Sequence, residues 1–185
     1  MTGVILFRAQ PFHNGHLHMI KKACQDMYQI NGALYILVGS ADKVGTKRNP
    51  IPIDLRINMI EESLKEALTE EEYNCVFIYP LEDLDDEANN THSWGDYLYK
   101  AMCQVSADED FIIYYSDNPS IMLSWFNDEV REHIAFKFLP RYDNISATLV
   151  RKCIEKDWQA TLSAIVPSPV YYRRELLKKY IEEGK

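Results

Sequence analysis

Long apolar runs and an excess of basic residues are both missing from this sequence. The longest apolar run near the start covers Val4 to Phe7, whereas a membrane-spanning helix needs about 20 residues. No small-residue cleavage site follows this run, so we expect a cytoplasmic protein. The 20 lysines and arginines stand against 28 acidic residues, giving a net charge of −8. Because this charge repels phosphate backbones and anionic lipid, we expect neither a nucleic-acid nor a membrane partner.

Cysteines are few and widely separated. None of the four belongs to a C-x-x-C pair, and in a chain without an export signal we expect reduced thiols, which argues against disulfides and zinc. We interpret Cys24, Cys75, Cys103 and Cys153 as buried small hydrophobic residues. Internal repeats, low-complexity tracts and linkers are also missing. We therefore expect one domain over residues 1–185, with 167–185 as a C-terminal helical extension.

Short β-rich runs alternate with longer segments of helical period. The candidate strands cover Val4–Phe7, Ala33–Val38, Cys75–Tyr79, Phe111–Tyr115 and Ala135–Leu139. Most of these runs are apolar on both faces, which is typical of a parallel sheet covered on both sides. The fold class predicted is α/β, with a doubly wound, mostly parallel five-stranded sheet and helices on both faces.

The helical segments follow from apolar spacing and from capping residues. The expected helices run from Asn14 to Tyr28, from Asp54 to about Leu68, from near Ser93 past Met102, from Asn118-Pro119 toward Val130, from Ser146 to Lys156 and from Tyr171 to Glu183. Thr69 to Glu72 are expected to end the second of these.

The segment from Phe7 to His16 links the first strand to the first helix and carries the clearest chemistry. Ligands of open parallel sheets bind beyond the carboxyl ends of the strands, where a helix start favours anions. His13 and His16 lie three residues apart and point the same way, with Gly15 leaving room for a phosphate. Imidazoles there, partly protonated near neutral pH, would stabilise charge on transferred and leaving phosphates.

Two plainer interpretations of these histidines stay open, a helix cap and a metal pair. The usual zinc pattern on a helix spaces its histidines by four and adds a glutamate, which is absent here, so we expect no metal ligands. His18, His92 and His133 lack such a context, and we interpret them as surface or satisfied core residues.

A second candidate phosphate site lies at the start of a helix far downstream, in the segment Ile145 to Arg151. The Ser146 and Thr148 hydroxyls, the free N–H groups and the Arg151 guanidinium can hold phosphate oxygens. Ordinary capping by Ser146 is the alternative.

These two segments resemble the H-x-G-H and I-S-x-T-x-x-R signatures of the nucleotidylyltransferase superfamily. The string Arg8-x-Gln10-Pro11-Phe12-His13-x-Gly15-His16-Leu17 is similar to the archaeal-type nicotinamide-nucleotide adenylyltransferases, which make NAD from ATP and nicotinamide mononucleotide. The resemblance implies a Rossmann-like fold and release of pyrophosphate. We expect Mg²⁺, which favours phosphate oxygens and water, as the cofactor that bridges the triphosphate.

Other segments are similar to elements of the same branch. Gly39-Ser40-Ala41, Lys47-Arg48-Asn49-Pro50 and Arg56 resemble its G-S-A, R-[ND]-P-F and E-R elements. The family's arginine before the proline reaches substrate phosphate, which implies Arg48, and Arg56 is interpreted as a solvated helix residue. Tyr79 to Leu84, Asn90 and Trp94 resemble a segment whose tryptophan stacks on nicotinamide, with a buried core tryptophan as the alternative. Ser116-Asp117-Asn118-Pro119 is similar to S-G-N-P, which borders adenine, and would otherwise be a turn.

The resemblance assigns roles residue by residue. It implies catalytic roles for His13, His16, Arg8 and Arg151, ATP contacts for Gln10, Phe12, Gly15, Ser116, Asn118, Ser146 and Thr148, and acceptor contacts for Ser40, Arg48, Asp83, Leu84, Asn90 and Trp94. The chain departs from the family at Phe7, where glycine is usual, at Ala147 and in the long acidic link 85–93. That link puts the acceptor pocket in question more than the reaction.

Three alternative functions follow from the same motifs. The chain is compatible with a phosphopantetheine adenylyltransferase, with a CTP-dependent cytidylyltransferase and with a module that senses nucleotides without catalysis. Retention of every charge-stabilising group favours an enzyme over a sensor. We expect small-molecule substrates, ATP and a mononucleotide, and a homo-oligomer, which is frequent in the family.

Overall fold

A five-stranded, wholly parallel sheet forms the centre of the molecule, with strand order β3-β2-β1-β4-β5. The computed structural model describes residues 1–84 and 91–184. The strands are β1 (Thr2–Phe7), β2 (Ala33–Val38), β3 (Val76–Pro80), β4 (Phe111–Tyr115) and β5 (Ile134–Phe138). Their ends lie within one or two residues of the expected runs. The predicted doubly wound α/β fold is confirmed.

Helices connect the strands and continue after the last one. In chain order they are α1 (Asn14–Gln29), α2 (Ile53–Ala67), α3 (Glu70–Tyr73), α4 (Thr91–Val105), α5 (Pro119–Leu123), α6 (Asp128–Arg131), α7 (Ala147–Glu155), α8 (Gln159–Ile165), α9 (Ser168–Tyr172) and α10 (Arg174–Glu183).

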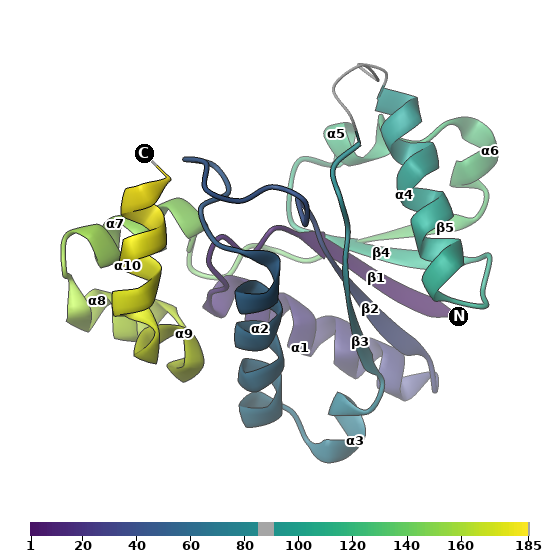
Figure 1. The fold of residues 1–185 in the computed structure, drawn as a ribbon. Helices are drawn as coiled ribbons and strands as arrows, with labels where there is room; N and C mark the ends of the chain where they lie inside the picture. The colour runs from purple at the N-terminus through teal and green to yellow at the C-terminus, as the bar shows by residue number, and fades with distance from the viewer. Residues whose placement is uncertain (85–90, 185) are drawn as a thin grey trace.

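The two faces of the sheet are covered by different helices (Figure 1). One core joins the sheet to α1, α2 and α7 to α10, and its buried members include Ile36, Ile60 and Val150. The other core packs α4, through Leu98 and Met102, against the opposite face. The burial of apolar surface on both faces of the strands explains why their sequences do not alternate. No helix among residues 1–84 and 91–184 is long and apolar enough to cross a membrane.

The single helix expected from Asn118 to Val130 is wrong, because the segment forms two short helices, α5 and α6. Between them Phe126 turns into the core and is only 2% exposed. The Trp125 carbonyl approaches Gly95 of α4 so closely that a Cβ on Gly95 would lie 1.9 Å from its oxygen. Asn127 then caps α6 by accepting a hydrogen bond from the Val130 N–H. Burial of Phe126 interrupts the helix.

The C-terminal part also differs from expectation. The helix expected from Tyr171 to Glu183 is divided into α9 and α10 at Arg173, whose ψ of 6° leaves the helical range, and α8 was not expected. A further difference lies in the middle of the chain. Thr69, expected to end the second helix, instead caps α3 in a reciprocal capping box with Glu72. Residues of α9 and α10 share the larger core with α2 and α7, so the segment 167–184 packs on the body of the protein.

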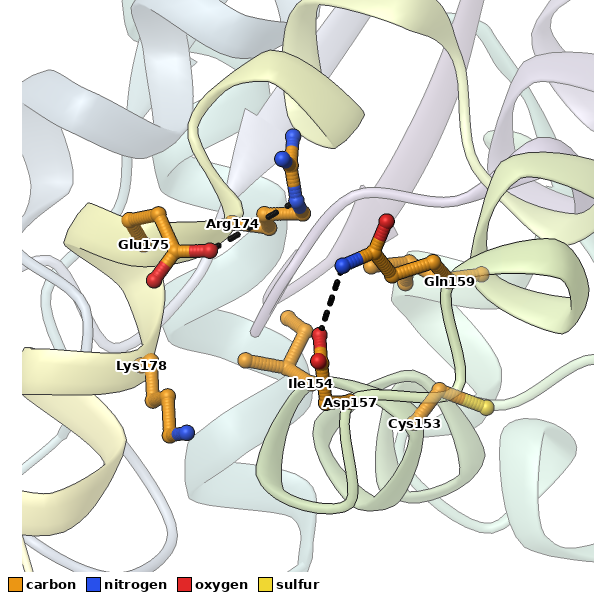
Figure 2. A pocket seen from close by; sticks show the side chains of 8 residues that line it. Cys153, Ile154, Asp157, Gln159, Arg174, Glu175 and Lys178 are labelled. Carbon is orange, nitrogen blue, oxygen red and sulfur yellow. Dashed lines mark hydrogen bonds and ion pairs between the residues drawn. The ribbon is translucent and has the colours of Figure 1, made fainter.

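The cysteines are free thiols, but only some are buried. Cys24 and Cys153 are buried as expected, whereas Cys75 and Cys103 are half-buried, which corrects the interpretation of all as core residues. Cys153 borders a small cavity of about 80 Å³ between α7, α8 and α10 (Figure 2). Its polar wall includes Asp157 and Gln159, which are joined by a hydrogen bond of 3.1 Å. This cavity shares no lining residue with the larger one at the sheet edge.

The strand order indicates which edge of the sheet can bind a ligand. The chain moves outward from β1 to β2 and β3, then crosses to β4 and β5 on the other side of β1. Loops therefore diverge at the carboxyl ends of β1 and β4, which is the topological switch point where open sheets bind ligands.

Candidate active site

Most of the predicted site residues line one cavity of about 780 Å³ at the carboxyl edge of the sheet. They come from the loops after all five strands and from the starts of α1, α4 and α7. The predicted residues that line it are Arg8, Gln10, His13, Gly15, His16, Ser40, Arg48, Asp83, Leu84, Trp94, Ser116, Ser146, Thr148 and Arg151. Segments far apart in the sequence thus meet at one site, as when Arg151 donates a hydrogen bond to the carbonyl of Gln10, 141 residues earlier in the chain.

Two of the predicted residues that the structure describes, Phe12 and Asn118, are not brought to the cavity wall. Phe12 is fully buried beneath it and stacks on the His16 ring, with centroids 5.5 Å apart. Asn118 caps α5 by accepting from the Ser120 N–H. Asn90 lies outside the described residues. Phe12 therefore packs behind the site, and Asn118 caps a helix at its rim.

The two histidines of the first motif are stacked on each other at the start of α1. Their ring centroids lie 3.7 Å apart, and the His13 ring nitrogen Nδ1 accepts a hydrogen bond from the His16 N–H. A Cβ on Gly15 would lie 3.0 Å from the His13 ring, so glycine is needed there for this ring as well. Phe7, the departure from the family's glycine, packs on His16 from the other side, 4.5 Å between centroids. His16 Nδ1 is buried without a partner among the described side chains and backbone.

This packing corrects the expected protonation of the histidines. Burial lowers the pKa of His13 to about 4, and the nearby Arg141 guanidinium acts in the same direction. Burial, followed by the neighbouring His13, holds the pKa of His16 well below its usual range. Both imidazoles are therefore neutral near pH 7 in the ligand-free protein. A bound polyanion would raise both pKa values again.

The low pKa of His13 makes stability depend on pH. A histidine whose pKa is lower in the folded state binds its proton mainly after unfolding, so it stabilises the fold above about pH 6.5 and progressively less toward about pH 4. Between about pH 7.5 and about pH 5, we expect the free energy of unfolding of wild type to fall about 2 kcal/mol more than that of His13→Asn. Asparagine retains helix capping. Urea unfolding at both pH values measures this, and equal losses in the two proteins would contradict it.

Arginines make the cavity cationic although the chain is acidic. Arg151 donates to the Gln10 carbonyl, 2.6 Å, and is half-buried. Burial and the positive charges of Arg48 and Arg151 lower the pKa of Arg8, whereas Asp83 raises it. Mutual repulsion of Arg8, Arg48 and Arg151 is relieved by a bound anion, which is the expected property of a phosphate site.

The second motif begins α7, as the sequence predicted. Ser146 is its N-cap and its hydroxyl accepts from the Leu149 N–H at 3.2 Å. The Thr148 hydroxyl accepts from Arg151 Nη2 at 3.4 Å. Capping and cavity lining coincide here, because Ser146, Thr148 and Arg151 all border the cavity. A Cβ on Gly15 would lie 3.7 Å from the Ile145 carbonyl oxygen, so the start of α7 adjoins the start of α1.

Arg56 is not the solvated helix residue that we expected. It is 0% exposed, and its guanidinium donates to the carbonyls of Arg8, Gly39 and Ser40 at 2.7, 2.8 and 2.9 Å. These carbonyls follow β1 and β2. The neighbouring Ala9 and Ser40 have positive φ angles of 51° and 52°, a region that favours glycine. Arg56 thus ties together two strained turns in the floor of the cavity.

The half of the cavity over β2 and β3 is built from side chains predicted to contact the acceptor. Ser40 Oγ donates to Asp83 Oδ1 at 2.9 Å and so joins the loops after β2 and β3. Trp94 is half-buried, lies 6.2 Å from Trp125 in an edge-to-face arrangement and exposes part of its ring to the cavity. The core and the ligand interpretations of Trp94 therefore both apply.

The half over β4 and β5 includes residues that the sequence analysis missed. Arg141 and Tyr142 follow β5 and line the cavity, and Arg141 pairs with Asp117 after β4. Tyr142 stacks on His18, 4.6 Å between centroids. Among the residues that follow β2, the sequence analysis also missed Asn49, which lies beside Arg48 and lines the cavity. The position of these residues just after strands was a usable signal, because carboxyl ends of parallel strands meet at one edge.

Every site residue predicted from the sequence lies within one family match. The cytidylyltransferase-like family model matches residues 8–153. The chain belongs to the cytidylyltransferase-like family. The matched segment of this family member includes every predicted site residue, from Arg8 to Arg151, and excludes α8, α9 and α10.

Two individual relatives resemble this chain over most of its length. The chain is 30% identical over 171 residues to a nicotinamide-nucleotide adenylyltransferase of Halorubrum lacusprofundi, covering 92% of this chain and 84% of the relative. It is 32% identical over 162 residues to the enzyme of the same name from Methanococcus aeolicus, covering 86% and 81%.

A solved structure gives the same fold. A bifunctional NMN adenylyltransferase/ADP ribose pyrophosphatase from Francisella tularensis, complexed with AMP and a Mn ion, matches with a TM-score of 0.66 and 26% identity. The match covers 84% of this chain, which spans about two fifths, 41%, of that longer protein.

A divalent metal fits this site only together with a nucleotide. Among the described residues, no group of three or more histidine, cysteine or acidic side chains can hold a metal ion. The acidic side chains that reach the cavity, Asp83 and Asp117, are engaged by Ser40 and Arg141. Mg²⁺ commonly binds through substrate phosphates and water, so this donor set suits an ion carried by the triphosphate.

Proposed function

We propose that this chain transfers the adenylyl group of ATP to nicotinamide mononucleotide, forming NAD and releasing pyrophosphate. The observation that carries the proposal is the meeting of both phosphate motifs, His13 with His16 and Ser146 with Arg151, in one cavity with a separate half on each side of β1. The likeness to nicotinamide-nucleotide adenylyltransferases over most of the chain supports the choice of substrates.

The reaction needs positioning and charge stabilisation rather than a nucleophilic side chain. An oxygen of the acceptor's 5′-phosphate attacks the α-phosphorus of ATP, the new P–O bond forms, and the bond to the bridging oxygen of the β-phosphate breaks. The electron pair leaves with pyrophosphate. Arg8 and Arg151 hold the triphosphate and offset the charge that develops on it. No residue of the chain becomes covalently modified.

The histidines act as neutral or ligand-protonated hydrogen-bond donors in this scheme. Stacking on Phe7 and on His13 fixes the His16 ring, so no reorganisation is needed as charge grows on the phosphates. A divalent ion, which we propose to be Mg²⁺, would neutralise phosphate charge when bound with ATP. The chain itself supplies the arginines, the imidazoles and the start of α7.

Each half of the cavity is proposed to bind one substrate. Ser116 and the segment Arg141–Tyr142 lie over β4 and β5, where we place ATP. Ser40, Arg48, Asp83, Leu84 and Trp94 lie over β2 and β3, where we place the mononucleotide, with the Trp94 ring against nicotinamide. A homo-oligomer and a cytoplasmic location stay predictions.

The direct test is pyrophosphate release with a panel of substrates. We expect NAD formation from Mg²⁺-ATP and nicotinamide mononucleotide, with the nicotinate form as a parallel acceptor. Phosphopantetheine and CTP, with its own acceptors, serve as controls. Preference for CTP would overturn the proposal, and ATP binding without product from any acceptor would indicate a sensing module.

A further inference from the structure

Asn49 has a buried side-chain oxygen without a hydrogen-bond partner among the residues that the structure describes. The residue is 7% exposed, lines the large cavity, and its Oδ1 finds no hydrogen-bond partner in the described part of the chain. Burying an amide oxygen without a partner is unfavourable. A ligand that supplies a donor removes that penalty.

The backbone around Asn49 is already fixed, so its amide is not needed for the turn. The Asn49 N–H donates to Thr46 Oγ1 at 3.0 Å, and the Thr46 N–H donates to the Asn49 carbonyl at 3.3 Å. Two residues on, the Gln10 side chain binds both backbone groups of Ile51, at 2.9 and 3.1 Å. The turn is thereby attached to the segment that carries His13.

The position of Asn49 selects the part of the ligand. It follows β2 and adjoins Arg48, on the β2 side of the switch point. Arg48 is proposed to hold the 5′-phosphate of the mononucleotide, and the ribose is directly bonded to that phosphate. The ribose hydroxyls are therefore the hydrogen-bond donors of a mononucleotide that lie nearest to Asn49.

We propose that Asn49 binds a ribose hydroxyl of the mononucleotide acceptor, through Oδ1, an inference that rests on the proposed function. The amide accepts the hydroxyl hydrogen while Arg48 lies beside it for the acceptor phosphate. The contact is to the sugar, so it serves the amide and the acid forms of the mononucleotide alike.

The last turn of α10 holds this turn in place. Gly184 is buried, and a Cβ there would lie 2.9 Å from the Thr46 carbonyl oxygen and 3.3 Å from Pro50 Cβ. Its φ of −82° suits any residue, so the need for glycine is a need for space. Figure 1 shows the C-terminal end of α10 beside the loop that follows β2. The C-terminal helix thus positions the turn that carries Arg48 and Asn49.

Steady-state kinetics of Asn49→Ala test the proposal. We expect the KM for the mononucleotide to rise about tenfold, in the same proportion for the amide and the acid forms, while kcat and the KM for ATP change by less than about twofold. Lys47→Ala, an exposed change in the same turn, is the matched control and should behave as wild type. An unchanged acceptor KM, a raised KM for ATP, or an altered amide-to-acid ratio would each overturn the assignment.

Two further variants keep the test decisive. If Asn49→Ala does not fold, Asn49→Ser, which retains a hydroxyl acceptor, should fold and show a smaller rise in the same KM. Gly184→Ala should raise the acceptor KM by about threefold by displacing the turn, unlike the exposed control Glu183→Ala. A wild type that forms no NAD overturns the proposed function, whereas an active wild type with an unchanged Asn49→Ser overturns only this inference.

Discussion

Replacing His16 by alanine is expected to lower kcat for NAD formation by about 100- to 1000-fold, the range for loss of one preorganised donor at a developing charge. His16 lies between Phe7 and His13, and its Nδ1 lacks a partner within the described residues. Its ring is therefore held in place but not consumed by internal hydrogen bonds. Stopped-flow or steady-state measurement of NAD and pyrophosphate gives the ratio.

The control for this prediction must separate chemistry from packing. His18→Ala lies on the same helix and removes a ring that stacks on Tyr142 at the cavity wall, so it should change the KM for ATP while keeping kcat within about threefold. His16→Gln retains a donor and should recover part of the rate. Full turnover by a folded His16→Ala protein would exclude His16 from the reaction.

Arg56→Met is expected to destabilise the fold by about 4 kcal/mol and to reduce activity with it. The change leaves the carbonyls of Arg8, Gly39 and Ser40 without their donor in a site that is 0% exposed. Burial lowers the pKa of Arg56 to about 10, which still leaves it protonated at neutral pH. Chemical denaturation gives the free energy of unfolding.

Comparison with neighbouring changes makes the result specific to the buried guanidinium. Asn58→Ala lies two residues away on the exposed face of α2 and should cost less than about 0.5 kcal/mol. Arg56→Lys retains the charge but not the fork of donors, so we expect an intermediate loss of about 2 kcal/mol. If Arg56→Met proved as stable as Asn58→Ala, the role of Arg56 in holding the turns after β1 and β2 would be refuted.

The sequence predicted the strands well and the connections between them less well. Runs such as Ala33–Val38 are continuous and apolar, and this local property can be recognised in the sequence without knowledge of the fold. The segment of α8 offers only one buried residue, Leu162, so it has no helical stripe to detect. The break between α5 and α6 depends on Phe126 packing against a core that is remote in sequence.

The limits at the site have a related physical cause. The paired motifs predicted that His13, His16, Ser146 and Arg151 would meet. This was possible because the topology brings the carboxyl ends of parallel strands to one edge. The burial of Arg56 was not predictable, because its partners are backbone carbonyls. Every residue has such a carbonyl, so the sequence does not show which ones the guanidinium will meet. The neutral state of the histidines depends on desolvation by Phe7 and the opposing ring, which exists only after folding.

The edge-to-face pair Trp94 and Trp125 gives the protein a built-in optical reporter. The chain has 3 tryptophans, and both members of this pair line the large cavity, whereas Trp158 is 45% exposed on the surface. A nicotinamide ring entering beside Trp94 would quench its emission, while ATP bound over β4 and β5 would affect it less. Occupancy of the acceptor half can therefore be followed in unlabelled protein by intrinsic fluorescence.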